Sequence, residues 1–203
     1  LLNEKYQEAH DMLLTKFPRH AGEDNNYGMP YQTVGDLILE FKGHEKVQKY
    51  YRDLDISQAV SSVSYQVDGV NFTREYIAST PDNVMAIKLG ADQPGFINFE
   101  MKVASPHTRK SIKTESNKLI LSGFGESVEN KQGKVEFNAQ FQPHLTGGDL
   151  AVTDSSLIIS NADEVVIYIS IGTNFNDYQD LSGNALERAT KSLELLANSS
   201  YNQ

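Results

Sequence analysis

Residues 59–79 read AVSSVSYQVDGVNFTREYIAS, and this stretch decides the fold. On each side of Asp68-Gly69, apolar and polar residues alternate with a period of two, which is typical of strands with one buried face. Asp-Gly between two such runs is a strong hairpin signal, because a type I′ turn needs positive φ at both central residues. The sequence therefore predicts an antiparallel hairpin with strands at 59–67 and 70–79.

The segments outside this hairpin repeat the pattern of short strands and turns. The run EVVIYISI at 164–171 is apolar at nearly every position, which favours a central strand. Many short strands without intervening helices indicate antiparallel sheets packed face to face. The predicted fold class is therefore mainly β, a large antiparallel β-sandwich (super-sandwich) with a helix near each end. Further strands are predicted at 33–41, 49–56, 84–89, 97–103, 118–122, 134–142, 150–153, 157–160 and 164–171.

Two segments carry apolar residues at spacings of three and four, which predicts amphipathic helices. The first runs from 2 to 17 and ends before Pro18, and the second runs from about 185 to 197. The inward positions of the strands between them should form the core. We expect burial of Val63, Tyr65, Val67, Phe72, Ile97, Phe99, Val135, Phe137, Val165 and Ile167.

Composition narrows the class of protein. A chain of 203 residues with 39% hydrophobic and 22% charged residues has an ordinary globular composition and can bury a substantial core. The net charge of -9 argues against nucleic acid or an anionic membrane as the main partner, since either requires a basic surface. There is no cysteine, which excludes disulfides and thiolate metal sites.

The sequence contains no recognisable catalytic or metal-binding pattern. Asp53 and Asp55 share one face of a predicted strand, but such pairs are common on solvated strands. His20 and Asp24 lack a second ligand at a regular spacing, so no metal site is expected. Most of the 10 tyrosines and 9 phenylalanines occupy alternating strand positions, which indicates packing. Exposed exceptions are expected at Tyr27, Tyr31 and Tyr178.

Several short motifs occur in a characteristic order across about half of the chain. They are Tyr31-Gln32, Gly35-Asp36-Leu37, Tyr51-Arg52-Asp53-Leu54-Asp55, Val63-Ser64-Tyr65, Thr73-Arg74-Glu75 and Ser79-x-Pro81-Asp82. In order and spacing they resemble the N-terminal β-sandwich domain of glycoside hydrolase family 95. That family contains α-L-fucosidases, and some relatives act on α-L-galactosides.

The resemblance implies a role for the whole protein and another for this chain. The whole enzyme would remove terminal α-L-fucosyl or α-L-galactosyl residues from glycans with inversion, would need no cofactor, and would be periplasmic or secreted. The family's catalytic acid and base lie in a helical toroid, and no position here matches them. The expected organisation is a β-sandwich domain at 1–182, including the helix at 2–17, and a helical segment at 183–203 that leads to a catalytic domain absent from this chain. Since no initiator methionine is present, we expect a segment of a longer protein.

This organisation implies a surface for the helical catalytic domain, the expected partner within the same polypeptide. Large or apolar residues in the irregular segment 27–32 and on the last helix are the candidates. The expected interface residues are Tyr27, Met29, Tyr31, Gln32, Leu193 and Leu196. Two other readings stay open: a stand-alone carbohydrate-binding module, and a structural sandwich without sugar contact.

Overall fold

The computed structural model describes residues 5–16, 31–128, 130–196 and 201. The chain divides into two compact units, Leu1–Gln32 and Thr33–Gln203. In the first, the described residues form helix α1 (Tyr6–Lys16), which confirms a helix within the predicted range 2–17. Neither described helix of the protein is long and apolar enough to cross a membrane.

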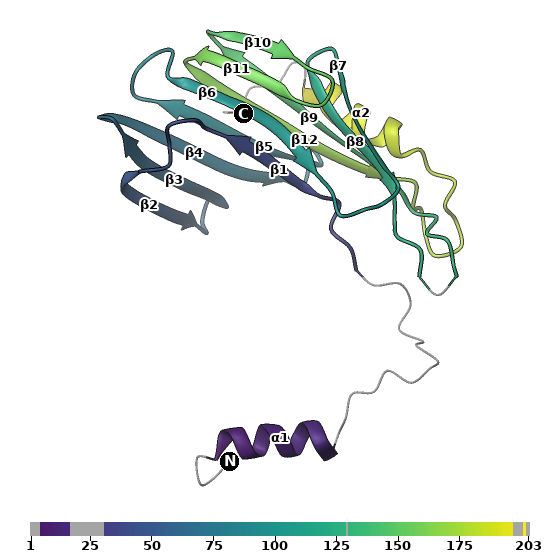
Figure 1. The fold of residues 1–203 in the computed structure, drawn as a ribbon. Coiled ribbons are helices and arrows are strands. Elements are labelled where there is room, and N and C mark those ends of the chain that lie inside the picture. The colour runs from purple at the N-terminus through teal and green to yellow at the C-terminus, as the bar shows by residue number, and fades with distance from the viewer. Residues whose placement is uncertain (1–4, 17–30, 129, 197–200, 202–203) are drawn as a thin grey trace. The chain divides into compact units, whose positions relative to one another are not determined.

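The second unit is a β-sandwich of two antiparallel sheets, as predicted (Figure 1). Its elements are β1 (Asp36–Glu40), β2 (Gln48–Asp55), β3 (Val60–Val67), β4 (Val70–Ser79), β5 (Val84–Ala91), β6 (Ile97–Ala104), β7 (Lys110–Glu115), β8 (Lys118–Phe124), β9 (Glu136–Thr146), β10 (Asp149–Val152), β11 (Leu157–Ala162), β12 (Glu164–Thr173) and α2 (Ala185–Leu195). The smaller sheet has the order β1-β6-β11-β10. The larger has the order β2-β3-β4-β5-β12-β9-β8-β7.

The hairpin of β3 and β4 forms as predicted. Asp68 and Gly69 have φ values of 49° and 86°, the positive values that a type I′ turn requires. The two strands pair from Val67↔Val70 to Ser61↔Tyr76 without a register shift. The alternation on each side of the turn therefore places one complete set of apolar side chains on the face toward the smaller sheet.

The core lies between the two sheets. Eight of the expected core residues are buried there: Tyr65, Val67, Phe72, Ile97, Phe99, Phe137, Val165 and Ile167. Val63 is only half-buried, although it packs against this core. Val135 is a correction, because it is exposed and lies one residue before β9 begins. The ladder between β8 and β9 ends at Phe124↔Glu136, so the alternation that buries Phe137 does not extend to Val135.

Strand β12 is central, as its apolar sequence predicted. It pairs with β5 on one side and β9 on the other. Val165, Ile167 and Ile169 enter the core between the sheets, whereas Val166 and Tyr168 enter a second cluster on the opposite face. Helix α2 covers that opposite face, so β12 is buried on both sides.

Helix α2 begins and docks through two local features. The Asn184 side chain caps its first turn by accepting a hydrogen bond from the Glu187 backbone N–H at 3.1 Å. Beneath the helix, β12 carries Gly172, where a Cβ atom would overlap the carbonyl oxygen of Ala185 and lie 2.9 Å from the Ala189 nitrogen. The absence of a side chain at Gly172 therefore sets how closely the helix approaches the sheet.

The two edge strands of the larger sheet differ from the sequence-based expectation. Strand β7 was not predicted, since Ile112 is its one apolar residue and its other positions are polar. Strand β2 was predicted, but Tyr50 and Tyr51 are exposed rather than packed. The outer edge of β2 has no neighbouring strand among the described residues, and neither of its faces is fully covered.

The Phe99 side chain tests the core assignment. It is buried between the sheets and stacks on Phe41 with ring centroids 4.9 Å apart. We expect Phe99→Ala to lower the free energy of unfolding by about 3–5 kcal/mol, because it removes apolar contacts and leaves a cavity. Chemical denaturation measures this, and a loss below about 1 kcal/mol would contradict the core assignment.

Gly172 tests the docking of α2. We expect Gly172→Ala to lower the free energy of unfolding by about 1–3 kcal/mol, because the added methyl group pushes the helix from the sheet. Hydrogen exchange should accelerate at the amides of α2, while the β3–β4 hairpin amides, far from the change, serve as the internal control. Unchanged exchange in α2 would show that the contact with Gly172 does not hold the helix.

Candidate domain interface

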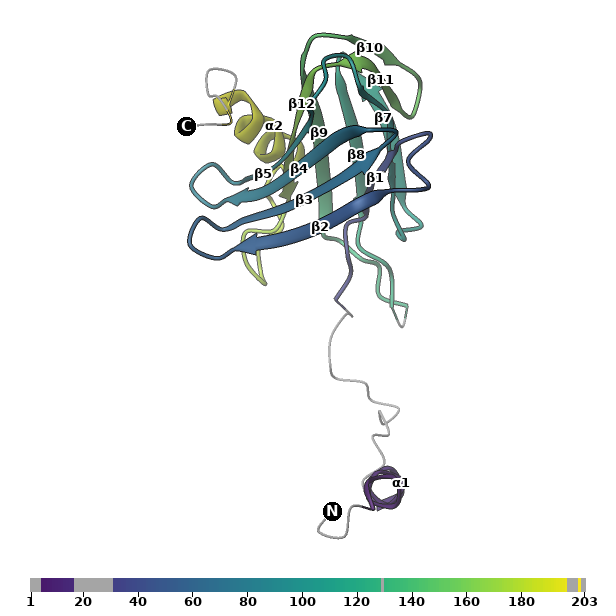
Figure 2. The ribbon, with the colours of Figure 1, turned by 90° about the vertical axis from the view of Figure 1, so that its left-hand side faces the viewer.

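The smaller sheet covers only part of the larger one. In Figure 2, the ends of β2, β3, β4 and β5 nearest residues 55–60 and 79–84 extend past the strands of the smaller sheet. At the opposite end of these strands, Tyr65 and Phe72 are buried. The inner face of the larger sheet, the face turned toward the smaller sheet, therefore continues beyond its cover.

The uncovered part of this inner face is apolar. Cross-strand pairing places Ala78, Met85 and Ile169 in one row, and Ile171 follows two residues later on β12. Leu54 lies on the same face of β2, and Ile56 follows at the end of that strand with 88% of its surface exposed. We call the surface formed by Leu54, Ile56, Ala78, Met85 and Ile171 the open apolar end.

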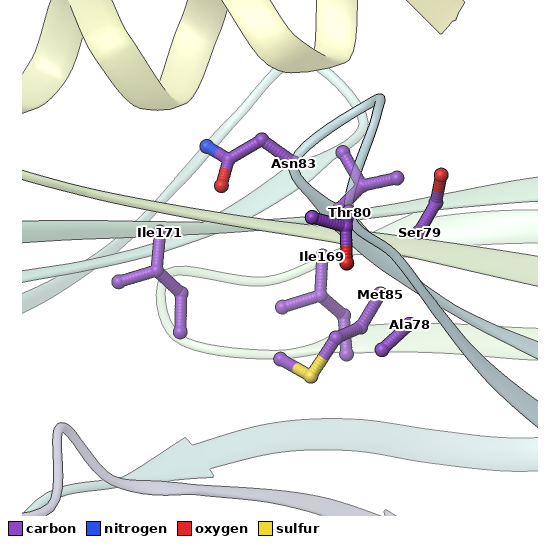
Figure 3. Close-up of a pocket in the computed structure, with 8 residues that line it drawn as sticks. Ala78, Ser79, Thr80, Asn83, Met85, Ile169 and Ile171 are labelled. Atoms are coloured by element: carbon purple, nitrogen blue, oxygen red, sulfur yellow. The ribbon is translucent and has the colours of Figure 1, made fainter.

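A hollow of about 280 Å³ lies in the open apolar end. Figure 3 shows Met85, Ile169 and Ile171 projecting to one side of the strands, with Asn83 on the other side near α2. The hollow exists because β5 pairs with β12 only as far as Ile169, whereas β12 continues to Thr173 beside β9. Exposed apolar groups around a concavity are typical of a surface that contacts another protein layer.

The expected interface residues are only partly found on the surface. Leu193 and Leu196 are 5% and 8% exposed, because they pack under α2 against Val166 and Tyr168 of the same chain. Leu193 and Leu196, expected as interface residues, are therefore not available on the surface of this chain. In the first unit, Tyr31 is 95% exposed, and Gln32 is half-buried with an interaction of its own.

The structure does not test the other four expected interface residues. Tyr27 and Met29 lie outside the described residues, and the roles of Tyr31 and Gln32 in an interface stay predictions. The boundary at 182/183 also stays a prediction, although α2 belongs to the same compact unit as the strands. Sequence reasoning missed the open apolar end, since its residues were read as core positions of ordinary strands.

Asp55, one of the two candidate carboxylates on β2, serves as a local hydrogen-bond acceptor. Asp55 accepts from the backbone N–H groups of Ser57 and Gln58 at 2.8 and 3.2 Å, and hydrogen bonds from Ser57 lower the pKa of Asp55. Asp163 accepts from Gly95 N–H at 2.7 Å. Asp53 is exposed on β2. Among the described residues, no group of three or more such side chains is arranged to hold a metal ion.

A half-buried cation, Arg74, occupies the covered end of the inner face. The Arg74 guanidinium carbon lies 4.4 Å from the ring centre of Phe41, and its Nη2 donates to the Tyr65 hydroxyl at 2.8 Å. The His44 Nδ1 lies 3.0 Å from the same hydroxyl, and its ring packs 4.5 Å from that of Phe72. The motif residue Arg74 therefore packs among aromatic rings, which identifies a structural role for that part of the motif.

His44 should make stability depend on pH. Burial and then the positive charge of Arg74 lower its pKa from the ordinary value of 6.5. Below that value the unfolded chain binds a proton that the folded chain resists, so this contribution to the free energy of unfolding falls as pH decreases. We expect wild type to lose more stability than His44→Gln between about pH 7 and pH 5, measured by urea denaturation. Equal losses would contradict this role of His44.

The comparison with protein families identifies the domain. A model described as the N-terminal domain of glycosyl hydrolase family 65 matches residues 1–178. The chain belongs to this family of N-terminal domains. The motif resemblance named family 95, whereas the matching model carries the number 65; both are N-terminal domains of glycoside hydrolases.

Two relatives extend this result. Alpha-L-fucosidase 2 from Arabidopsis thaliana is 40% identical over 168 residues, which cover 72% of this chain and 20% of that protein. A putative kojibiose phosphorylase from the human microbiome superposes with a TM-score of 0.54 at 10% identity, over 84% of this chain and 26% of that one. The second likeness shows the fold alone. This glycosyl hydrolase N-terminal domain thus spans about a fifth of the curated relative's length.

Proposed function

We propose that this chain is the non-catalytic N-terminal scaffold domain of an inverting, α-L-fucosidase-like or α-L-galactosidase-like glycoside hydrolase of the family 95 type. The observation that carries the proposal is its 40% identity to alpha-L-fucosidase 2, of which it covers only 20%. The parent enzyme would act on terminal sugars of glycans. Its helical catalytic domain, in the same polypeptide, would be the partner of this sandwich.

The chemistry of the described residues supports a non-catalytic role. Inverting hydrolysis needs one carboxylic acid to protonate the leaving group and one carboxylate to activate water across the bond. Asp55 is engaged by backbone N–H groups of its own turn, and Glu164 forms an ion pair with Lys88 at 3.0 Å. These carboxylates stabilise turns and strand pairs, so the acid and base are assigned to the partner domain.

The open apolar end supports a scaffold role. Leu54, Ile56, Met85 and Ile171 would be covered by a packed second domain, which would remove their apolar surface from water. We therefore assign the open apolar end to the contact with the catalytic domain. The exposed residue Tyr31 from the first unit keeps its place among the proposed contacts.

Activity of the isolated chain provides one test. We expect the purified 203-residue chain to show no cleavage of an aryl α-L-fucoside, because it would lack the acid and base. The released phenol is measured by absorbance over a long incubation. Turnover that survives purification and disappears in Asp53→Asn or Asp55→Asn would overturn the non-catalytic assignment.

A substitution in the open apolar end provides a second test. In the 203-residue chain, Ile171→Lys should change the free energy of unfolding by less than about 0.5–1 kcal/mol, since Ile171 already contacts water. In the longer polypeptide it should cost several times more, because the charge would be buried at the interface. Thermal unfolding of both proteins measures this difference.

Ile158→Lys is the matched control for that substitution. Ile158 is 37% exposed and Ile171 is 36% exposed, but Ile158 lies on the smaller sheet and outside the open apolar end. Its replacement should have the same small effect in both proteins. If Ile171→Lys behaves like Ile158→Lys in the longer polypeptide, the open apolar end is not the domain interface.

A further inference from the structure

A second hollow, of about 560 Å³, is lined mainly by outer-face residues of β3 and β4 and adjoins the first hollow at Ala78 and Ser79. Val60 and Ile77 contribute apolar groups to its lining, and the ring of Tyr201 lies beside them. Ile77 and Tyr201 also border the apolar cluster beneath α2. The hollow therefore occurs where α2 no longer covers the outer face of the larger sheet.

Polar groups of three kinds line this hollow: the Glu75 carboxylate, the Gln58 amide and the Ser79 hydroxyl. Glu75 Oε2 accepts a hydrogen bond from the Tyr201 hydroxyl at 3.1 Å. Its other oxygen has no hydrogen-bond partner among the described residues, so it can accept from a ligand. Burial and the neighbouring Glu75 raise the pKa of Tyr201, which keeps the phenol protonated as the donor to Glu75.

The polar surface extends from the hollow toward β2. Cross-strand pairing places Asp53, Ser62 and Glu75 in one row. The next row contains Tyr51, whose ring is exposed at the edge of the sheet. Carboxylates, a hydroxyl and an exposed aromatic ring thus follow one another across the outer faces of β2, β3 and β4.

The groups around the hollow select among ligand classes. An anion would be repelled by Glu75 in a chain of net charge -9, because the neighbouring cation Lys88 already forms an ion pair with Glu164 at 3.0 Å. An apolar ligand would remove water from the Glu75 carboxylate without donating a hydrogen bond in its place. A sugar offers hydroxyl donors for the carboxylate, hydroxyls for the amide, and an apolar C–H face for Val60, Ile77 and the Tyr201 ring. The volume is within the usual range of about 300–1,000 Å³ for small-ligand sites.

We propose that this outer-face hollow is a non-catalytic sugar-binding site that holds one neutral monosaccharide unit of a glycan through Glu75, Gln58 and Tyr201. The row of Asp53 and Ser62 would meet a neighbouring sugar unit. Glu75 and Ile77 lie on the opposite face of β4 from Ala78 of the open apolar end, and the two hollows meet at Ala78 and Ser79, which line both. The site is independent of the fucosidase assignment, since it requires neither a catalytic domain nor a particular parent enzyme.

Saturation-transfer difference NMR on the 203-residue chain tests the proposal, with the methyl glycosides of L-fucose, D-galactose and D-glucose as probes. At least one should receive saturation from the protein. In the unmodified chain, amide shifts should change at Glu75, Ile77 and Gln58. No transfer to any of the three sugars, or shifts confined to the open apolar end, would overturn the proposal.

Glu75→Gln should weaken binding by about tenfold or more, because it removes the charged acceptor while preserving size. Glu115→Gln is the matched control: it makes the same change at an exposed carboxylate of β7, at the opposite edge of the larger sheet from β2, and affinity for a monosaccharide should stay within about twofold. Amide spectra report whether each variant folds. If Glu75→Gln does not fold, Gln58→Ala in the exposed turn replaces it, and unchanged affinity in a folded variant contradicts the site.

The sugar-binding and scaffold assignments can fail separately. Absence of sugar binding would leave the stability difference of Ile171→Lys unaffected, because that residue is on the other face. Conversely, a failure of the scaffold assignment would not alter the NMR result. Binding without any hydrolysis of the probe is the combination expected when both are correct.

Discussion

The structure depends on the burial of β12 on both faces. Val165 and Ile167 require the smaller sheet as cover, and Val166 and Tyr168 require α2. A strand in the middle of the larger sheet can bury such a sequence only if a layer lies on each side of the sheet. This requirement places the helix and the smaller sheet on opposite faces.

The smaller sheet and α2 each cover only part of the larger sheet. The parts of the larger sheet that they leave uncovered carry the proposed domain interface and the proposed sugar-binding site. On the inner face, the apolar alternation continues past the smaller sheet and produces the open apolar end. On the outer face, α2 stops before β3 and β4, where the alternate positions carry Ser62 and Glu75. Opposite faces of the same strands therefore carry different chemistry, because side chains alternate with a period of two.

Buried polar groups show how the layers are joined. Beneath α2, Gln140 donates to the Thr190 hydroxyl at 2.8 Å and to the Asn138 side-chain oxygen at 3.1 Å, so strand β9 and the helix share a polar contact. Between the sheets, Arg74 is held by aromatic rings and the Tyr65 hydroxyl. The buried Gln140 amide is tolerated because its hydrogen bonds are provided locally, whereas the half-buried Arg74 has one nitrogen, Nε, without a hydrogen-bond partner among the described residues. Of the pair Asp53 and Asp55, Asp55 accepts hydrogen bonds from the turn that follows β2, and Asp53 is exposed on the strand.

The sequence by itself determined the strands other than β7, the hairpin at Asp68-Gly69, the sandwich class and the membership in a family of glycoside hydrolase N-terminal domains. These features depend on the alternation of apolar residues, on turn residues and on the order of motifs, and all three can be read from neighbouring residues along the chain. Only the tertiary structure decided which strands lie at the edges of the larger sheet, and how far the smaller sheet and α2 extend over its two faces. It exposed Tyr51 on β2, buried Leu193 and Leu196 on the side of α2 that faces the sheet, and left Ile171 open beyond Val84, where β5 begins. Exposure of a given side chain depends on residues distant in the sequence, and the periodicity of one strand contains no information about the extent of the layer packed against it.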